Sequence, residues 1–159
     1  MQHDSNLKIP LMIWSELLNE LHRRTEERHE SGAFLLGHTR GKSRYVERVI
    51  YYDDLDPNAY RTGVVTMHAA SFGRLWDLCR SGGMSVVADI HVHPKHAFQS
   101  IADQHNPMIA LSGHLALIVP WFARYPAKLN EFGFFEYRGG RRWRPLGGEH
   151  ITKFLHIEP

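Results

Sequence analysis

Two histidines one residue apart, His91 and His93, have the spacing in this chain that is best suited to chemistry. They end a segment, residues 85–93, in which apolar and polar positions alternate. Strand side chains repeat every two residues, so both imidazoles are expected on the same side of one β-strand. Pro94 follows directly and turns the chain away. Two imidazoles presented together in this way indicate a candidate metal site.

A serine and an aspartate, Ser100 and Asp103, follow after a short loop. Ser100 suits the N-cap of a helix, which would place Asp103 in the first turn and bring its carboxylate back to the imidazoles. A catalytic zinc takes three protein ligands and keeps a fourth position for water, and two histidines with one carboxylate form such a set. Each pair also has a simpler interpretation. His91 and His93 could be two polar residues that face solvent, and Ser100 and Asp103 could form a helix cap without a chemical role. Their occurrence within thirteen residues favours the metal site.

Three segments occur in a characteristic order: ESGAFLLG at residues 30–37, HVHP at 91–94 and SIAD at 100–103. This order resembles the JAMM motif of the MPN (Mov34/Pad1/JAB) metalloproteases, in which a glutamate opens a strand and H-x-H-P and S-x-x-D follow. The resemblance implies a zinc isopeptidase that removes ubiquitin or ubiquitin-like proteins from their targets.

Matched position by position, the resemblance implies a role for five residues. His91, His93 and Asp103 correspond to the ligands of Zn²⁺, and Glu30 corresponds to the general base. Ser100 corresponds to the hydroxyl that helps to hold the tetrahedral oxyanion. A positioned base is needed because zinc lowers the pKa of its water only to about 7, and the proton must still be moved.

Residues 99–123 are most similar to the small bacterial JAB proteins, which are encoded beside E1-like, E2-like and ubiquitin-like partners in antiphage operons.

Two features depart from the usual motif. Six residues, instead of seven, separate His93 from Ser100, so the loop is tighter and the position of Ser100 is the one most affected. Pro107 lies soon after Asp103, so the helix that carries the aspartate is expected to be short.

The elements that must position these residues follow from periodicity and from turn residues. A helix is expected over residues 11–29, with an apolar stripe at helical spacing, and a second helix carries the stripe of Phe72, Leu75, Trp76 and Cys79 and ends at Gly82-Gly83. A connecting loop is expected at residues 53–63. Strands are expected at residues 33–36, 45–52, 64–67, 85–93, 115–119 and 132–137, and a Gly139-Gly140 hairpin leads into a last strand at 141–144. This order predicts an α/β fold, a single MPN/JAB-like domain over residues 1–159 with a mixed, mainly antiparallel sheet flanked by helices.

Asp89 shares the expected strand face with the two histidines, and three roles remain open for it. It could bind the metal, orient a ligating imidazole, or be a solvated carboxylate. His96 and His105 lie close to the motif in sequence, and surface positions are the simpler interpretation for both.

Two further segments could contact partners. The expected C-terminal hairpin contains a tryptophan among four arginines: Arg138, Arg141, Arg142, Trp143 and Arg144. These side chains could bind an acidic protein surface or nucleic acid, although a solvated, charged hairpin edge is commoner. The loop at residues 53–63 lies where JAMM proteases carry an insertion that grips the ubiquitin-like tail, but an ordinary connection is an equally simple interpretation.

Bulk properties exclude several other classes of protein. A net charge of +2 is too small to indicate nucleic-acid binding, and no stretch approaches the roughly 20 apolar residues that a membrane span needs. The single cysteine, Cys79, excludes an internal disulfide and a Cys-rich zinc knuckle and suits a reducing compartment. The N-terminus has no apolar run of signal-peptide length. A soluble cytoplasmic protein of one domain is therefore expected.

Three functions remain open from the sequence. The first is an isopeptidase that acts at the C-terminus of a ubiquitin-like protein, with E1-like and E2-like proteins as further partners. The second is a non-catalytic MPN scaffold, although scaffolds of this kind typically lack the ligands that this chain keeps. The third is a zinc hydrolase of a small amide or of a sulfur-carrier adduct, which would use the same residues.

Overall fold

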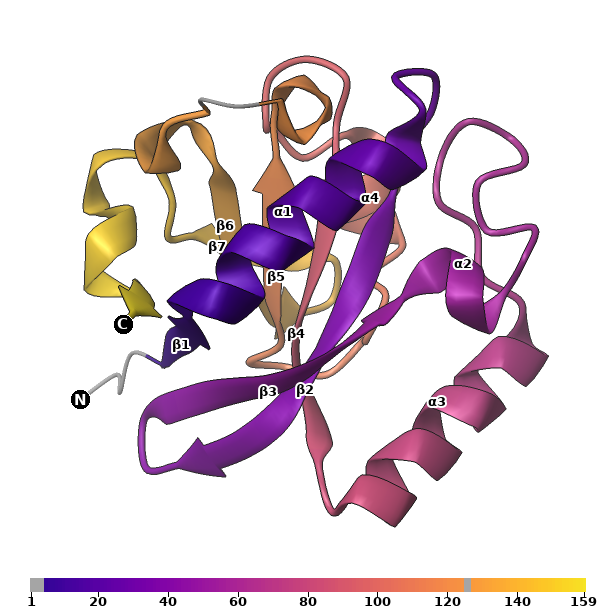
Figure 1. Ribbon diagram of the computed structural model, residues 1–159. Coiled ribbons are helices and arrows are strands. Elements are labelled where there is room, and N and C mark those ends of the chain that lie inside the picture. The colour runs from indigo at the N-terminus through magenta and orange to yellow at the C-terminus, as the bar shows by residue number, and fades with distance from the viewer. Residues whose placement is uncertain (1–4, 125–126) are drawn as a thin grey trace.

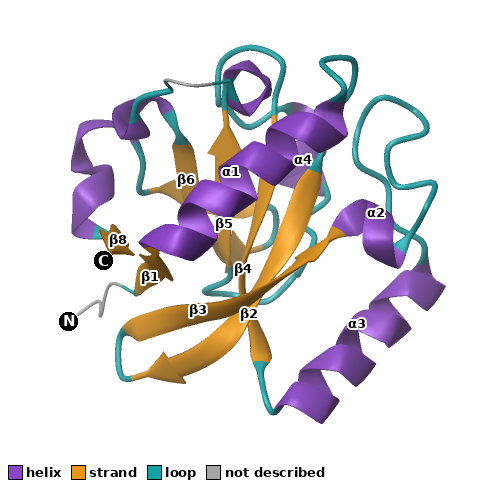
Figure 2. Cartoon of the chain, in the orientation of Figure 1, coloured by secondary structure: helices purple, strands orange, loops and turns teal. Residues whose placement is uncertain are grey.

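The computed structural model of the chain describes residues 5–124 and 127–159 (Figure 1). One curled sheet of eight strands runs through these residues in the order β7-β6-β5-β4-β2-β3-β1-β8 (Figures 1 and 2). The strands are β1 (Asn6–Pro10), β2 (Gly32–Arg40), β3 (Ser43–Tyr51), β4 (Ser85–Val92), β5 (Leu115–Val119), β6 (Gly133–Gly139), β7 (Arg142–Pro145) and β8 (Leu155–Glu158).

The sheet is mixed, as the sequence predicts. Among the described strands, β2 pairs antiparallel with β3 and β4, and β6 pairs antiparallel with β5 and β7. The parallel pairs are β1 with β3, β1 with β8, and β4 with β5. The parallel pairing of β4 with β5 matters most for the site, because the segment between these two strands must cross back over the sheet and carries the S-x-x-D sequence.

Helices cover both faces of the sheet, so the predicted α/β class with flanking helices is confirmed. The helices are α1 (Leu11–Thr25), α2 (Tyr52–Leu55), α3 (Ala69–Gly82) and α4 (Ile101–His105), with 3₁₀ turns at Trp121–Ala123, Leu129–Glu131 and Gly148–Lys153. In Figure 1, α1 crosses the front of the sheet, and α3 lies at the lower right, beside the strands β2 and β4. No helix in the described part of the chain is long and apolar enough to cross a membrane.

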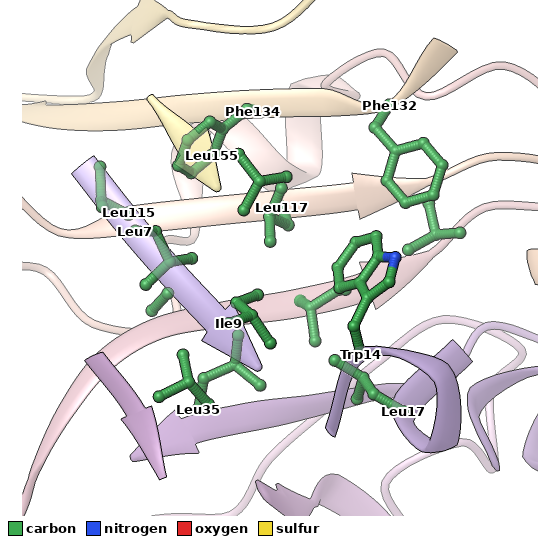
Figure 3. Close-up of a cluster of buried hydrophobic side chains, with 14 of the residues drawn as sticks. Leu7, Ile9, Trp14, Leu17, Leu35, Leu115, Leu117, Phe132, Phe134 and Leu155 are labelled. Atoms are coloured by element: carbon green, nitrogen blue, oxygen red, sulfur yellow. The ribbon is translucent and has the colours of Figure 1, made fainter. Parts of the chain in front are cut away.

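Two hydrophobic clusters form on opposite faces of the sheet because strand side chains alternate. Leu35 of β2 packs with Trp14 and Leu17 of α1 in the larger cluster, part of which Figure 3 shows. Its neighbour Phe34 packs with Leu75 of α3 in the smaller cluster. The two clusters explain why residues 33–36 are uninterruptedly apolar, since this strand is buried on both faces.

The alternation that the sequence predicts for β4 is correct near the histidines and wrong at the start of the strand. Val87 packs in the larger cluster together with Ala88 and Ile90, whereas Val86 packs against the smaller one. The cause is a bulge, since the β2–β4 register shifts where Leu35 and Leu36 pair with Ala88 and Val86.

Other element boundaries differ from the predictions. The first helix ends at Thr25 and not near residue 29, because Glu26 and Glu27 have left-handed backbone angles that a helix cannot continue. Residues 64–67 form no strand, and the N–H of Val65 among them donates to Glu30. The loop expected at residues 53–63 begins inside the short helix α2. Strands β1 and β8 were not predicted, because each is short and is stabilised by a partner that is distant in sequence.

Two glycines provide a test of this packing. Gly37 lies at a register shift between β2 and β3, where an added Cβ would stand 1.7 Å from the carbonyl oxygen of Tyr45. We expect Gly37→Ala to lower the free energy of unfolding by roughly 3 kcal/mol. Gly73 is an exposed position inside α3 with open space around it, so Gly73→Ala should raise that energy by about 0.5–1 kcal/mol. Urea unfolding of both variants measures the difference, and equal effects of the two changes would contradict the packing described here.

Candidate metal centre

The end of β4 carries both histidines to the same side of the sheet, as the alternation predicts. The Nε2 atoms of His91 and His93 are 2.9 Å apart, and the imidazoles are largely buried. His93 lies just past the strand, and its backbone is held on both sides: its N–H donates to Val119, and its carbonyl accepts from Phe122. The two ring nitrogens therefore have a defined separation before any ligand is considered.

The short helix α4 brings Asp103 to the histidines. Ser100 and Asp103 form a capping box, in which the Ser100 Oγ accepts from the Asp103 N–H at 3.1 Å and the Ser100 N–H donates to Asp103 Oδ2 at 3.0 Å. Asp103 Oδ1 is 3.4 Å from His91 Nε2, and Asp103 Oδ2 is 3.2 Å from His93 Nε2. The helix has five residues, in agreement with the short helix that Pro107 predicts. The structure thus brings together the three residues that sequence reasoning selected.

Glu30 approaches the same cluster from the segment between α1 and β2. Its Oε1 is 3.6 Å from His93 Nε2, and its Oε2 accepts the Val65 N–H at 3.3 Å. The Glu30 N–H in turn donates to the Gly63 carbonyl. Gly63 and Val65 therefore hold Glu30 in position. Val65 lies in the segment 64–67, for which a strand was expected.

The carboxylate and the imidazoles influence one another's pKa. Burial alone would raise the pKa of the Asp103 carboxyl, but its hydrogen bonds with His91 and His93 hold that pKa well below its usual range. Burial would likewise lower the pKa of His91, yet the hydrogen bond and charge of Asp103 raise it above its ordinary value. Asp103 therefore stabilises positive charge between itself and the imidazoles, whether a proton or a metal ion carries that charge.

The donor set fits a zinc ion. Bonds of about 2.0–2.1 Å in a tetrahedral site place ligand atoms about 3.4 Å apart. The two Nε2 atoms are 2.9 Å apart, and the distances from them to the two Asp103 oxygens, 3.4 Å to Oδ1 and 3.2 Å to Oδ2, are of that order. Ligand atoms of Glu30, His91 and His93 also lie within 4.8 Å of one another, so a second carboxylate stands beside the same point. Cys79, the single cysteine, is buried in the smaller hydrophobic cluster and takes no part.

Asp89 forms no hydrogen bond or ion pair with His91 or His93 among those of the described residues. It is buried at 2% exposure, and its Oδ2 lies 2.6 Å from Nε2 of His114, a residue that sequence reasoning did not select. The interpretation of Asp89 as a solvated carboxylate is therefore wrong, and the imidazole that it orients is that of His114. His114 directly precedes the apolar strand β5, and a polar residue at the start of a fully buried strand was the signal that could have identified it.

The remaining candidates lie outside the cluster. His96 and His105 are exposed, in line with the simpler interpretation of both. The hairpin forms with a tight turn at Gly139–Arg141, where all three residues have positive φ, and it packs on α4, since the Trp143 Nε1 donates to the Gln104 carbonyl.

The loop at residues 53–63 is anchored at several points. Arg24 forms ion pairs with both Asp53 and Asp54. The Tyr60 hydroxyl accepts the Gly32 N–H and lies within donating distance of Asp53 and of the Gly32 carbonyl. Asp56 accepts from Asn58 and His68, and these hydrogen bonds from the side chain and backbone of His68 lower its pKa to about 2. The loop is thus a folded part of the wall beside Glu30.

Comparisons with known proteins agree with this description at a coarse level. No known protein-family profile matches the chain. A probable metalloprotease, y4jG of Sinorhizobium fredii, is 28% identical over 75 residues; the match spans about half of each chain, 47% of this one and 46% of the relative. The solution structure of protein DSY2949 from Desulfitobacterium hafniense superposes with a TM-score of 0.70 at 19% identity and covers 96% of this chain and 94% of its own, which shows a shared fold.

Proposed function

We propose that this protein is a zinc metalloprotease of the JAMM/MPN type, in which His91, His93 and Asp103 hold the metal and Glu30 is the general base. The observation that carries the proposal is the convergence of both Nε2 atoms and both Asp103 oxygens within 3.4 Å, with the Glu30 carboxylate beside them. The distant similarity to a probable metalloprotease supports the same class of reaction.

Glu30 is positioned to move the proton. A zinc ion, when bound, supplies a Lewis acid that polarises a scissile carbonyl and makes water acidic enough to attack it near neutral pH. The Val65 N–H holds one oxygen of Glu30, and the other faces His93, where it can accept a proton from the attacking water. The same carboxyl can then deliver that proton to the leaving amine.

Ser100 can stabilise the oxyanion without giving up its role as a cap. Its Oγ accepts the Asp103 N–H, so the hydroxyl hydrogen remains available as a donor. Because Ser100 lines the cavity beside His91, that donor can reach a carbonyl oxygen that is being attacked.

Ser100→Ala tests this role. Loss of a single oxyanion donor costs on the order of 3 kcal/mol, so we expect kcat/KM to fall about 100-fold with the zinc content unchanged. The lost cap should lower the free energy of unfolding by only about 1 kcal/mol. Ser100→Thr, which keeps the hydroxyl, is the matched control and should retain most activity. A decrease below ten-fold in Ser100→Ala, with stability intact, would show that Ser100 acts as a helix cap only.

The substrate we propose is a linkage that follows the C-terminus of a ubiquitin-like protein. Extended, glycine-ended tails suit an active site at a strand end, because they bind through backbone hydrogen bonds. The motif resembles that of the bacterial JAB proteins, so we place the enzyme in a cytoplasmic ubiquitin-like conjugation pathway of antiphage defence, with E1-like and E2-like proteins as partners. A second candidate is hydrolysis of a small amide, which a cavity of about 500 Å³ next to the cluster favours by its size.

The experiment is to incubate the zinc-loaded protein with ubiquitin-like fusions from its own genome, with a generic unfolded protein and with small peptide amides. Mass spectrometry then locates each cut. We expect cleavage directly after the ubiquitin-like C-terminus and none in the unfolded protein. Cleavage of peptide amides alone would favour the second candidate, and cuts scattered through the unfolded protein would exclude the ubiquitin-like specificity.

A further inference from the structure

A cavity of about 500 Å³ opens on the His91 side of the metal cluster. Glu30, His91, Ser100 and Asp103 form one of its walls, while His93 does not line it. A cavity of this size holds a small molecule or a long side chain, and a glycine would leave it empty. The proposed reaction alone therefore does not account for it.

Most of the remaining wall is apolar and aromatic. Its members come from the segment after α2, from α3, from the segment after α4, from β5 and from the hairpin; among them are Val65, Met67, Phe72, Met108, Ile118 and Trp143. None of the described residues that line the cavity is a lysine or an arginine. Away from the metal cluster, a ligand in this cavity thus meets mainly hydrophobic surface and no lysine or arginine.

Asp89 and Tyr52 add a polar end to this cavity. The Asp89 carboxylate is 2% exposed, and its Oδ2 is hydrogen-bonded to His114. The Tyr52 hydroxyl is fully buried and lies against the Asp89 carboxylate. Burial, followed by the charge of Asp89, raises the pKa of Tyr52 well above its usual value, so the hydroxyl stays neutral beside the carboxylate. The hydroxyl oxygen can still accept a hydrogen bond, so a ligand that donates hydrogen bonds can contact both groups at this end of the cavity.

We propose that this cavity is a specificity pocket for a substrate residue next to the cleaved bond that has a lysine-like side chain, an alkyl stem ending in a cation. The stem contacts the apolar wall, and the cation binds Asp89 and Tyr52 at the polar end. An anionic side chain would meet the carboxylates of Glu30, Asp89 and Asp103. This proposal rests on the proposed protease function for its reaction, while the binding of the side chain can be measured separately.

The first measurement compares substrates on the wild-type protein. Fusions that differ only in the residue next to the cleaved bond, on either side of it, carry lysine, norleucine, glutamate or glycine there. Norleucine keeps the alkyl stem and lacks the charge. At one of these two positions, we expect kcat/KM for the lysine substrate to be at least ten times that for the norleucine substrate. The difference between the lysine and glutamate substrates should be larger still.

The second measurement is binding without turnover. Isothermal titration with N-acetyl-lysine methylamide and N-acetyl-norleucine methylamide should show at least ten-fold tighter binding of the lysine compound. Asp89→Asn should reduce both the lysine preference and this binding difference to near two-fold, and Tyr52→Phe should reduce them less. Asp77→Asn, an exposed change outside the cavity, is the matched control and should leave both unchanged.

The outcomes separate this proposal from the function on which it rests. Tighter binding of the lysine compound without cleavage of any substrate would support the pocket and overturn the protease. Cleavage with equal rates for lysine and norleucine, and equal binding of the two amides, would overturn the pocket and leave the protease standing. If Asp89→Asn fails to fold, the comparison of substrates and amides on the wild-type protein still decides between these outcomes.

Discussion

Glu30→Gln should lower kcat by about 10²–10⁴-fold while the metal content stays at the wild-type level. The amide keeps the size of the side chain, and its oxygen can still accept the Val65 N–H that holds Glu30 in the structure. It cannot accept a proton from water, and it cannot donate one as a carboxylic acid to the leaving amine. Single-turnover kinetics on a ubiquitin-like fusion, together with elemental analysis of the same sample, measures both quantities.

Glu26→Gln is the matched control, because Glu26 is an exposed glutamate four residues earlier that lies outside the cluster. It should cleave at the wild-type rate. Wild-type turnover of Glu30→Gln would exclude Glu30 as the base. An equal loss in both variants would point to damage of the turn between α1 and β2 instead of a loss of proton transfer.

His91→Ala and Asp103→Ala should each abolish activity and leave zinc well below one ion per chain. The wild-type protein, prepared without chelator, is expected to carry about one zinc per chain. We propose three donors for the ion, which the structure brings within 3.4 Å of one another, so removal of one donor should leave a site that binds the ion much more weakly. Elemental analysis of all three proteins measures the loading, and His105→Ala, an exposed histidine near the motif, should load fully.

Asp103 needs a further variant because it both caps α4 and approaches the imidazoles. Asp103→Asn keeps an oxygen that can accept the Ser100 N–H, so it retains the cap, but it removes the carboxylate charge. Low zinc loading with unchanged thermal stability of the metal-free protein would separate metal binding from capping. Equal loading in His91→Ala, Asp103→Ala and the wild type would exclude this metal centre.

The sequence by itself determined the parts of the site that depend on local geometry. The two-residue repeat of a strand placed His91 and His93 on one side of β4, and the capping box placed Asp103 in the first turn of α4 with Ser100. Both rules act over fewer than five residues, so neither needs knowledge of the fold. The mixed sheet with flanking helices could also be predicted, because the apolar runs and turn residues mark most of its elements.

The position of Glu30 beside the histidines does not follow from local geometry, because sixty residues separate Glu30 from His91 in the chain. Strands β2 and β4 pair with Gly32 opposite His91, and the Val92 N–H donates to Ser31 just beyond that pair. This antiparallel register brings Glu30 beside His93. Periodicity could not reveal that register, and only the resemblance to the JAMM motif pointed to Glu30.

The partner of Asp89 and the cavity were decided only by the tertiary structure. Asp89 pairs with Ala116 across the parallel strands β4 and β5, which brings His114, two residues earlier, against its carboxylate. The cavity has walls from the segment after α2, from α3, from β5 and from the hairpin, and no local pattern relates these segments. The bulge at Val87 likewise depends on pairing with a strand that is distant in sequence. Local periodicity therefore identified the groups that can do chemistry, and long-range strand pairing decided what surrounds them, because register and packing are properties of the whole sheet.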